Sequence, residues 1–170
     1  MGIETEPQNW YRDEFLLSTE QSLLQIDAIY DAMDSDVFWW TPAIPKDTLR
    51  KALRNSLSFG LYELPHSTSQ IASQETPKQI GLMRVITDDV TFAYLTDVYV
   101  LPEYQGKGLG RWMLGCLDEA IKAWPLLRRF MLLTSSKSIN LYKDTLAVND
   151  WVECGGGLVM GMSKGPGAAH

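Results

Sequence analysis

Three glycines at alternate positions, Gly106, Gly108 and Gly110, lie between an apolar stretch and an amphipathic one. Because glycine has no Cβ, a chain that contains it can turn tightly and come close to a ligand. A helix that begins at such a turn presents backbone N–H groups and a partial positive charge, and phosphate is the usual anion bound there. Lys107 and Arg111 add side-chain charge at the same place. These residues predict a phosphate-binding turn between a strand and a helix.

Two other glycine-rich motifs do not fit this chain. The dinucleotide motif G-x-G-x-x-G fails because Arg111 stands at the position of its last glycine, and the nucleotide-hydrolase loop fails because Gly108 follows Lys107 in place of Ser or Thr. Gly161–Gly165 matches G-x-S-x-G, but a hydrolase needs a helix, an acid and a histidine after that motif. Only His170 follows, so a serine hydrolase is excluded.

The segment Gln105–Gly110 resembles the Q/R-x-x-G-x-G/A signature of the GNAT superfamily of acetyl-coenzyme-A-dependent N-acetyltransferases. Asp97–Val100 resembles the strand that precedes this loop in the family, and Pro102–Tyr104 resembles its lead-in. Asn140–Tyr142 is similar to a motif in the fourth helix of the family. The chain departs from the family at Ala147-Val148, where relatives often have glycine followed by an aromatic residue or Met.

The resemblance implies how acetyl-coenzyme A is bound. In the family, backbone N–H groups of the loop bind the pyrophosphate, and the pantetheine arm adds to the strand edge before the loop. Val98 and Val100 are therefore expected to contact the arm through their main chains, and Asn140 through a hydrogen bond. The expected loop contacts are Gln105, Gly106, Lys107, Gly108, Leu109, Gly110 and Arg111. The alternative is that these glycines only form a tight turn.

Two residues are candidates for the transfer of protons. The expected reaction is direct attack of an amine on the thioester, so the amine must lose a proton and the departing thiolate can receive one. The resemblance places Tyr142 beside the coenzyme sulfur, and a phenol with a reference pKa near ~10 can donate that proton. Core packing is the alternative for Tyr142.

Asp97 is the candidate base or amine-binding carboxylate. On a regular strand it shares a face with apolar neighbours such as Leu95 and Tyr99, where an unpaired carboxylate is costly. A bulge in this strand would change the face it meets. The alternative is a structural aspartate paired with an arginine or a backbone amide.

Phe38, Trp39 and Trp40 are the candidate acceptor contacts. They lie between the first two predicted helices, where the resemblance implies an acceptor pocket. Three consecutive aromatic residues cannot all face one way, so at least one is expected to be exposed or to line a cleft, and the others to pack in the core. Asp34 and Asp36 beside them are either a cap-and-turn pair or an attraction for a cationic amine.

The charge of the chain is unevenly distributed. The 170 residues suggest about one domain, and the net charge of −6 excludes a general binder of nucleic acids or membrane surfaces. Residues 1–64 carry 5 basic and 11 acidic side chains, whereas 105–143 carry 7 and 2. We interpret the basic stretch as the site of a polyphosphate coenzyme and the acidic stretch as the border of a cationic acceptor.

Sorting signals and metal ligands are sparse. Cys116 and Cys154 do not make a disulfide framework, no secretory signal is recognisable, and no apolar run approaches the ~20 residues of a membrane span. A cytoplasmic location is expected, with the nucleus also open. His66 and His170 are the only histidines, so no metal site is expected.

The elements predict a single α/β (α+β) domain of the GNAT type, with a mixed, mostly antiparallel sheet of about seven strands and four flanking helices. The strands are expected at 12–19, 57–64, 79–87, 91–101, 130–134 (a wholly apolar run, expected to be a buried strand), 151–154 and 158–163. The helices are expected at 20–33, 47–56, 108–124 and 136–146. Residues 1–9 and 165–170 are expected to be loose, and 65–78 to form either a hairpin tip or a wall over the site.

The resemblance implies an N-acetyltransferase that moves an acetyl group from acetyl-coenzyme A to a primary amine, and we expect the amine to belong to a small molecule. A protein amine as acceptor is the second reading. The third is a sensor that binds acyl-coenzyme A without turnover. A homodimer is a habit of the family and remains open here.

Overall fold

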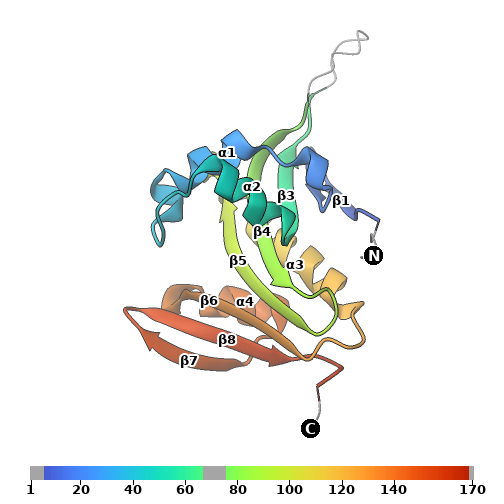
Figure 1. Cartoon of the computed structure of the whole chain (residues 1–170), viewed down its shortest axis with the longest axis vertical. Helices are drawn as coiled ribbons and strands as arrows, with labels where there is room; N and C mark the ends of the chain where they lie inside the picture. Colours follow the sequence, from blue (N-terminus) through green and yellow to red (C-terminus); the bar gives the residue numbers. More distant parts are fainter. Residues whose placement is uncertain (1–5, 67–75, 169–170) are drawn as a thin grey trace. The chain divides into compact units, whose positions relative to one another are not determined.

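The structure, a computed structural model, describes residues 6–66 and 76–168. Its contacts divide the chain into two compact units, which are described separately. The first unit comprises Met1–Leu82 and Tyr99–Tyr104, and the second comprises Met83–Val98 and Gln105–His170. Strands β4 (Lys78–Thr87) and β5 (Phe92–Val100) contribute residues to both units. Both strands are labelled in Figure 1.

The first unit packs two helices on three antiparallel strands and the adjoining part of β4. The strands are β1 (Asn9–Arg12), β2 (Phe15–Ser18) and β3 (Leu57–Glu63), and the helices are α1 (Ile26–Met33) and α2 (Lys46–Arg54). Ile29 from α1 and Leu49 from α2 are almost fully buried in one cluster with Leu82 of β4. The apolar stripes read from the sequence therefore face this core, and α2 begins after Pro45 as its sequence predicts.

The first predicted strand, 12–19, is wrong as a single element. The chain instead turns at Asp13, whose φ of 52° is left-handed, and forms the two short paired strands β1 and β2. Aspartate is one of the few residues other than glycine that adopt this conformation readily. The described sheet consequently has eight strands, where about seven were expected.

The first predicted helix, 20–33, is interrupted. A short 3-10 turn, η1 (Gln21–Leu23), precedes α1, because Gln25 is extended rather than helical. The backbone N–H of Gln25 donates to Oε1 of Gln79 at 2.7 Å, and the backbone N–H of Gln79 donates to Oε1 of Gln25 at 3.0 Å. This reciprocal pair between residues 54 positions apart competes with helix formation, and periodicity along the chain does not reveal it.

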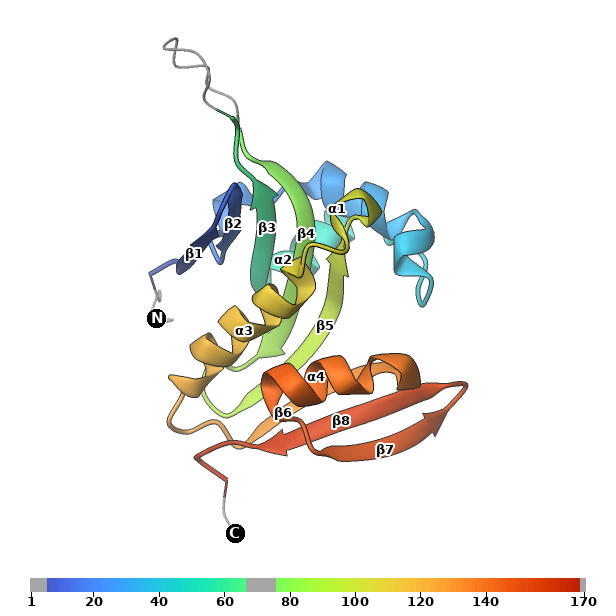
Figure 2. The same ribbon diagram turned by 180° about the vertical axis from the view of Figure 1, so that it is seen from behind.

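The second unit contains the other edge of the sheet. Strand β6 (Arg129–Ser135) runs parallel to β5, and β8 (Leu158–Lys164) is antiparallel to β6 and to the edge strand β7 (Asp150–Gly155). Helices α3 (Leu109–Lys122) and α4 (Ile139–Leu146) contact each other, and α4 covers one face of β6 and β8 (Figure 2). The strand order is β1-β2-β3-β4-β5-β6-β8-β7, which confirms a mixed, mostly antiparallel sheet with four helices.

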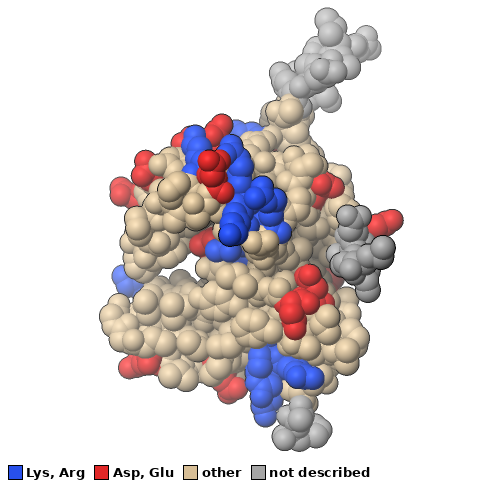
Figure 3. Space-filling model, in the orientation of Figure 1, with Lys and Arg blue, Asp and Glu red and all other residues tan. Residues whose placement is uncertain are grey.

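Strand β6 is only partly buried, so the prediction of a buried strand at 130–134 is wrong for one of its faces. Phe130 and Leu132 are buried, but Leu133 is 42% exposed. The side chains alternate because α4 covers one face of the strand, whereas the opposite face carries apolar residues toward solvent. Figure 3 shows a wide surface without charged side chains over these strands. By strand register this face includes Met131, Leu133, Val152, Met160 and Met162.

Both chain ends are tied down where the structure describes them. The backbone N–H of Gly165 donates to the carbonyl of Arg128 at 3.2 Å, and that of Gly167 to the carbonyl of Leu127 at 2.9 Å, so 165–168 are not loose. Asn9, also expected to be loose, begins β1. The predicted polar segment 65–78 lies largely outside the described residues. No helix in the described ranges is long and apolar enough to cross a lipid bilayer.

Candidate active site

The loop before α3 has the conformation that its glycines predict. Gly106 and Gly108 have φ angles of 81° and 74°, in the left-handed region that strongly favours glycine. Gly108 immediately precedes α3 and has no side chain that could cap the first N–H groups of the helix. A Cβ built on Gly110 meets no atom within 4 Å, and residues 105–108 are exposed. The turn thus offers an open helix start suited to the phosphates of a coenzyme.

The lead-in to this loop is anchored in the first unit. Tyr104 is 8% exposed, and its hydroxyl donates to Oε2 of Glu63 at 2.5 Å. Nζ of Lys78 donates to the same hydroxyl at 3.3 Å and lies 5.2 Å from the ring centroid. The hydrogen bond to Glu63 and then burial raise the pKa of Tyr104. Sequence reasoning missed this group because its members are far apart along the chain.

Helix α4 places Tyr142 in the same unit as the loop. Tyr142 is 8% exposed, and burial raises the pKa of its phenol, a change partly offset by a hydrogen bond with Thr134. A phenol with a raised pKa stays protonated at neutral pH, which an acid requires. Arg111 in the first turn of α3 and Asp144 on α4 form an exposed ion pair with an N–O distance of 3.9 Å. Thr134 had not been singled out from the sequence.

Asn140 and Tyr142 lie on different faces of α4. Two positions along a helix correspond to a rotation of about 200°, and Asn140 is exposed while Tyr142 is buried. Just beyond the helix, Ala147 has a φ of 50° and is exposed. This is the position where the sequence departs from the family pattern, and its left-handed backbone explains why glycine suits it.

The carboxylate of Asp97 is engaged in an ion pair. Nε of Arg84 donates to Oδ2 of Asp97 at 2.7 Å, and the two side chains are 17% and 9% exposed. Asp97 also has a left-handed φ of 52° inside β5. The arrangement favours the second expectation for this residue, a structural pairing with an arginine. Arg84 was missed, although a single arginine within the apolar run of β4 is a signal that could have drawn attention to it.

The three consecutive aromatic residues have different environments, as predicted. Phe38 is 2% exposed and packs against Tyr99 with ring centroids 5.1 Å apart, so it offers little surface to a substrate. Trp39 and Trp40 are 68% and 40% exposed, and their rings are nearly perpendicular with centroids 5.8 Å apart. We therefore no longer expect Phe38 to contact the acceptor, and the prediction of an acceptor contact is kept for Trp39 and Trp40.

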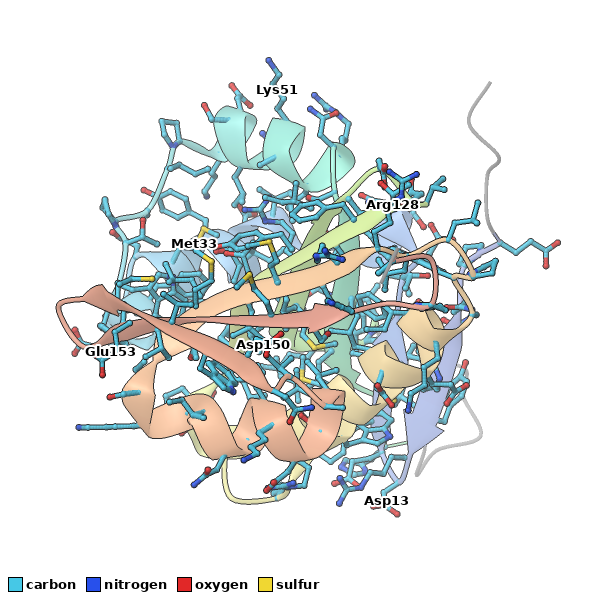
Figure 4. The ribbon with its side chains drawn as sticks, turned by 90° about the horizontal axis from the view of Figure 1, so that it is seen from below. Asp13, Met33, Lys51, Arg128, Asp150 and Glu153 are labelled. Atoms are coloured by element: carbon cyan, nitrogen blue, oxygen red, sulfur yellow. The ribbon has the colours of Figure 1, made fainter. Side chains whose placement is uncertain are left out.

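Acidic and basic side chains lie on different segments of the first unit. Asp34 and Asp36 are exposed and form no ion pair with any residue that the structure describes, and Ser35 between them supplies the cap by accepting from the N–H of Val37. Helix α2, in contrast, is basic, and Figure 3 shows blue side chains over it. Lys51 points away from α2 into solvent in Figure 4. The basic residues of α2 are Lys46, Arg50, Lys51 and Arg54.

The predicted coenzyme contacts on β5 belong to different units. Val98 ends the β5 segment of the second unit, and Val100 lies in the first. Both are partly exposed. Among the residues that the structure describes, no group of three or more His, Cys, Asp or Glu side chains could hold a metal ion.

Comparisons with known proteins agree with this geometry. Residues 26–146 match the family described as "Acetyltransferase (GNAT) family". The chain is 49% identical to the Gibberella zeae protein named "Putative acetyltransferase FG08082", with 98% of each chain covered. A GNAT-family crystal structure from Xanthomonas campestris pv. campestris is 34% identical, covers 78% of this chain and 82% of its own, and has a TM-score of 0.57.

A more distant structure shares the fold. The ribosomal-protein-S5-alanine acetyltransferase from Vibrio fischeri is 15% identical, with a TM-score of 0.62 over 92% of this chain and 96% of its own. The match over most of the chain and the 49% identity together place this chain in the GNAT acetyltransferase family.

Proposed function

We propose that this protein transfers the acetyl group of acetyl-coenzyme A to a primary amine of a small molecule. The observation that carries the proposal is the exposed loop of Gly106 and Gly108, which leads into α3 in the same unit as the buried Tyr142. Anion binding at the loop and a protonated phenol on the neighbouring helix α4 are two functions that an acetyl-coenzyme-A-dependent transfer uses.

Coenzyme binding rests on backbone groups. The N–H groups at the start of α3 hold the pyrophosphate, and Lys107 and Arg111 add positive charge beside it. The main chain of Val98 contacts the pantetheine arm, and Asn140 on α4 of the same unit is an additional contact. The exposure of residues 105–108 and of Asn140 supports these assignments, because a ligand can reach them.

In the reaction, the neutral amine attacks the thioester carbonyl, a C–N bond forms, and the C–S bond breaks. Tyr142 donates its phenolic proton to the departing thiolate, which leaves as the thiol of coenzyme A. The proton lost by the amine passes to water, since both carboxylate oxygens of Asp97 are engaged, one by Arg84 and the other by Thr96 at 3.5 Å. Tyr142 is restored by proton exchange with solvent before the next turnover.

The acceptor is expected to carry a positively charged ammonium group and to contact Trp39 and Trp40. Exposed tryptophan rings attract ammonium groups through their negative faces, and Asp34 and Asp36 add negative charge on the same segment. An alkylammonium is already held in this way within the first unit. Nζ of Lys46 pairs with Asp27 at 2.7 Å and lies 5.1 Å from the ring centroid of Tyr30.

The test is release of coenzyme A thiol from acetyl-coenzyme A with a panel of amines, diamines and basic peptides. Tyr142→Phe is expected to lower kcat at least tenfold with little change in the coenzyme Kd. Tyr11→Phe, a matched change at a tyrosine that is 68% exposed, is the control. Activity of the native chain should rise with pH as the amine loses its proton, and should not decline below pH ~10 because the pKa of Tyr142 is raised.

The same panel separates the other readings. Near-native turnover of Tyr142→Phe would remove this residue from the mechanism. Tight coenzyme binding without turnover on any amine favours the sensor. Basic peptides outperforming all small amines would favour a protein acceptor, a class that includes the Vibrio fischeri enzyme by its name.

A further inference from the structure

Asp97 has a backbone conformation that a strand interior does not normally contain. Its φ of 52° lies in the left-handed region, within the β5 segment Phe92–Val100. Side chains other than glycine are strained there because Cβ approaches the neighbouring carbonyl, and aspartate and asparagine tolerate it best. Such outliers persist where surrounding contacts hold them, and they concentrate at functional sites.

The carboxylate of Asp97 forms an ion pair with Arg84 at this distorted position. The distance from Nε of Arg84 to Oδ2 of Asp97 is 2.7 Å, and both groups are mostly buried within the second unit. Oδ1 lies 3.5 Å from the hydroxyl of Thr96. Consecutive side chains on a regular strand point to opposite faces, so this contact shows that the strand is distorted between Thr96 and Asp97.

The distortion immediately precedes the proposed coenzyme contact. Val98 follows Asp97, and the direction of its N–H and carbonyl groups depends on how the backbone is turned at residue 97. A contact that fixes the backbone at residue 97 therefore also fixes the direction of the N–H group of Val98.

We propose that Arg84 and Asp97 are positioning residues, whose ion pair holds the left-handed turn of β5 and so orients Val98 toward the coenzyme. This inference rests on the proposed function. It assigns Asp97 a part in coenzyme binding rather than the part of a base, and it adds Arg84, which lies on the neighbouring strand β4, to the residues that coenzyme binding depends on.

Substitutions at residue 97 distinguish a positioning residue from a base. Asparagine is neutral and cannot act as a carboxylate base, but it accepts a hydrogen bond and tolerates a left-handed φ. Asp97→Asn replaces the ion pair with Arg84 by a weaker neutral hydrogen bond, so the coenzyme Kd is expected to rise severalfold, while kcat at saturating coenzyme falls by less than about tenfold. The double variant Arg84→Met/Asp97→Val removes both charges together and places a β-branched residue where φ is positive. Its Kd for acetyl-coenzyme A is expected to rise at least tenfold.

The experiment measures acetyl-coenzyme A binding by titration calorimetry, with kcat from thiol release and a thermal melt for each variant. Asp118→Asn/Lys122→Met removes an ion pair on α3 in the same unit and serves as the matched control, with no change in Kd expected. If the double variant does not fold, Arg84→Lys and Arg84→Met replace it, and Kd should rise in that order because lysine keeps the charge but not the Nε donor.

The outcomes are separable. If the native chain does not bind acetyl-coenzyme A, the proposed function itself is wrong. A native chain that binds, with a double variant of unchanged Kd, overturns the positioning role of the ion pair and leaves the proposed function standing. A loss of kcat of a hundredfold or more in Asp97→Asn, at unchanged Kd, also overturns the positioning role and makes Asp97 the base.

Discussion

The loop before α3 and the segment between α1 and α2 offer different parts of the chain to a ligand. At the loop, Gly106 and Gly108 have left-handed backbones and the helix start is open, so the main chain is presented. Between the helices, Trp39 and Trp40 are exposed, and two exposed carboxylates, Asp34 and Asp36, lie on the same segment, so side chains are presented.

This difference indicates what each region can recognise. Backbone N–H groups are the same in every residue, and a loop that uses them binds one invariant group such as a pyrophosphate. Side chains differ in size and charge, and a surface made of them can be adapted to a particular acceptor. The coenzyme region is therefore readable from a short motif, whereas the acceptor region is not.

The largest effect is expected at the loop. Gly108→Val places a β-branched residue at a φ of 74°, a strain of about 2 kcal/mol or more that the coenzyme-binding conformation must bear. This corresponds to a coenzyme Kd raised about 30-fold, which calorimetry can measure. Gly115→Val on α3, where φ is not positive and a Cβ meets open space, is the matched control. An unchanged Kd for Gly108→Val would show that the loop does not bind through its backbone.

A smaller effect is expected at the tryptophans. Trp39→Ala/Trp40→Ala should raise the KM of the best amine about tenfold and leave the coenzyme Kd unchanged, because it removes aromatic surface worth roughly 1–2 kcal/mol to a cation. Tyr11→Ala, at another highly exposed aromatic residue, is the control for non-specific loss. An unchanged KM in the double variant would show that the acceptor does not bind at these tryptophans.

A still smaller effect is expected from the carboxylates. Asp34→Asn/Asp36→Asn should lower kcat/KM for a diamine about threefold at low salt, and the difference should fade at high salt because exposed charges are screened. Asp47→Asn on the basic helix α2 is the matched control. If acidic or neutral amines are the best acceptors, the negative charge of this segment is a solvated surface without a role in recognition.

The smallest effect is expected at Ala147, a residue with a left-handed backbone outside both regions. Ala147 lies at the end of α4 and has a φ of 50°. Ala147→Gly should stabilise the protein by about 0.5–1 kcal/mol, a rise of a few degrees in Tm, without altering coenzyme binding. A changed Kd in this variant would mean that the end of α4 takes part in the site.

Local signals predicted most elements, and long-range contacts account for the errors. The helix 108–124 and the strands 57–64 and 79–87 are confirmed because periodicity, glycine and proline act within a few residues of each other. The predicted helix 20–33 is broken by Gln79, 54 residues from Gln25. The predicted buried strand 130–134 is half exposed because apolar composition does not reveal how many faces of a strand are covered.

The candidate site divides in the same way. The loop motif was predicted from residue types and spacing, and Tyr142 was predicted from the resemblance to the GNAT family. The partners that hold the site could not, since Glu63 lies 41 positions from Tyr104 and Arg84 lies 13 positions from Asp97. Among the three adjacent aromatic residues, the sequence required different environments but did not say which one is buried, and packing against Tyr99 makes it Phe38.

By itself, then, the sequence determined that the chain has a glycine turn between a strand and a helix, and the resemblance of the residues around this turn to the GNAT family implied acetyl-group transfer. The turn could be predicted because it depends on the missing Cβ of glycine and on helix geometry, both of which are local. Only the tertiary structure decided that Asp97 is paired with Arg84, that Tyr142 is buried beside Thr134, and that Trp39 and Trp40 face solvent. Burial and pairing depend on residues distant in the chain, which meet only when the fold is complete.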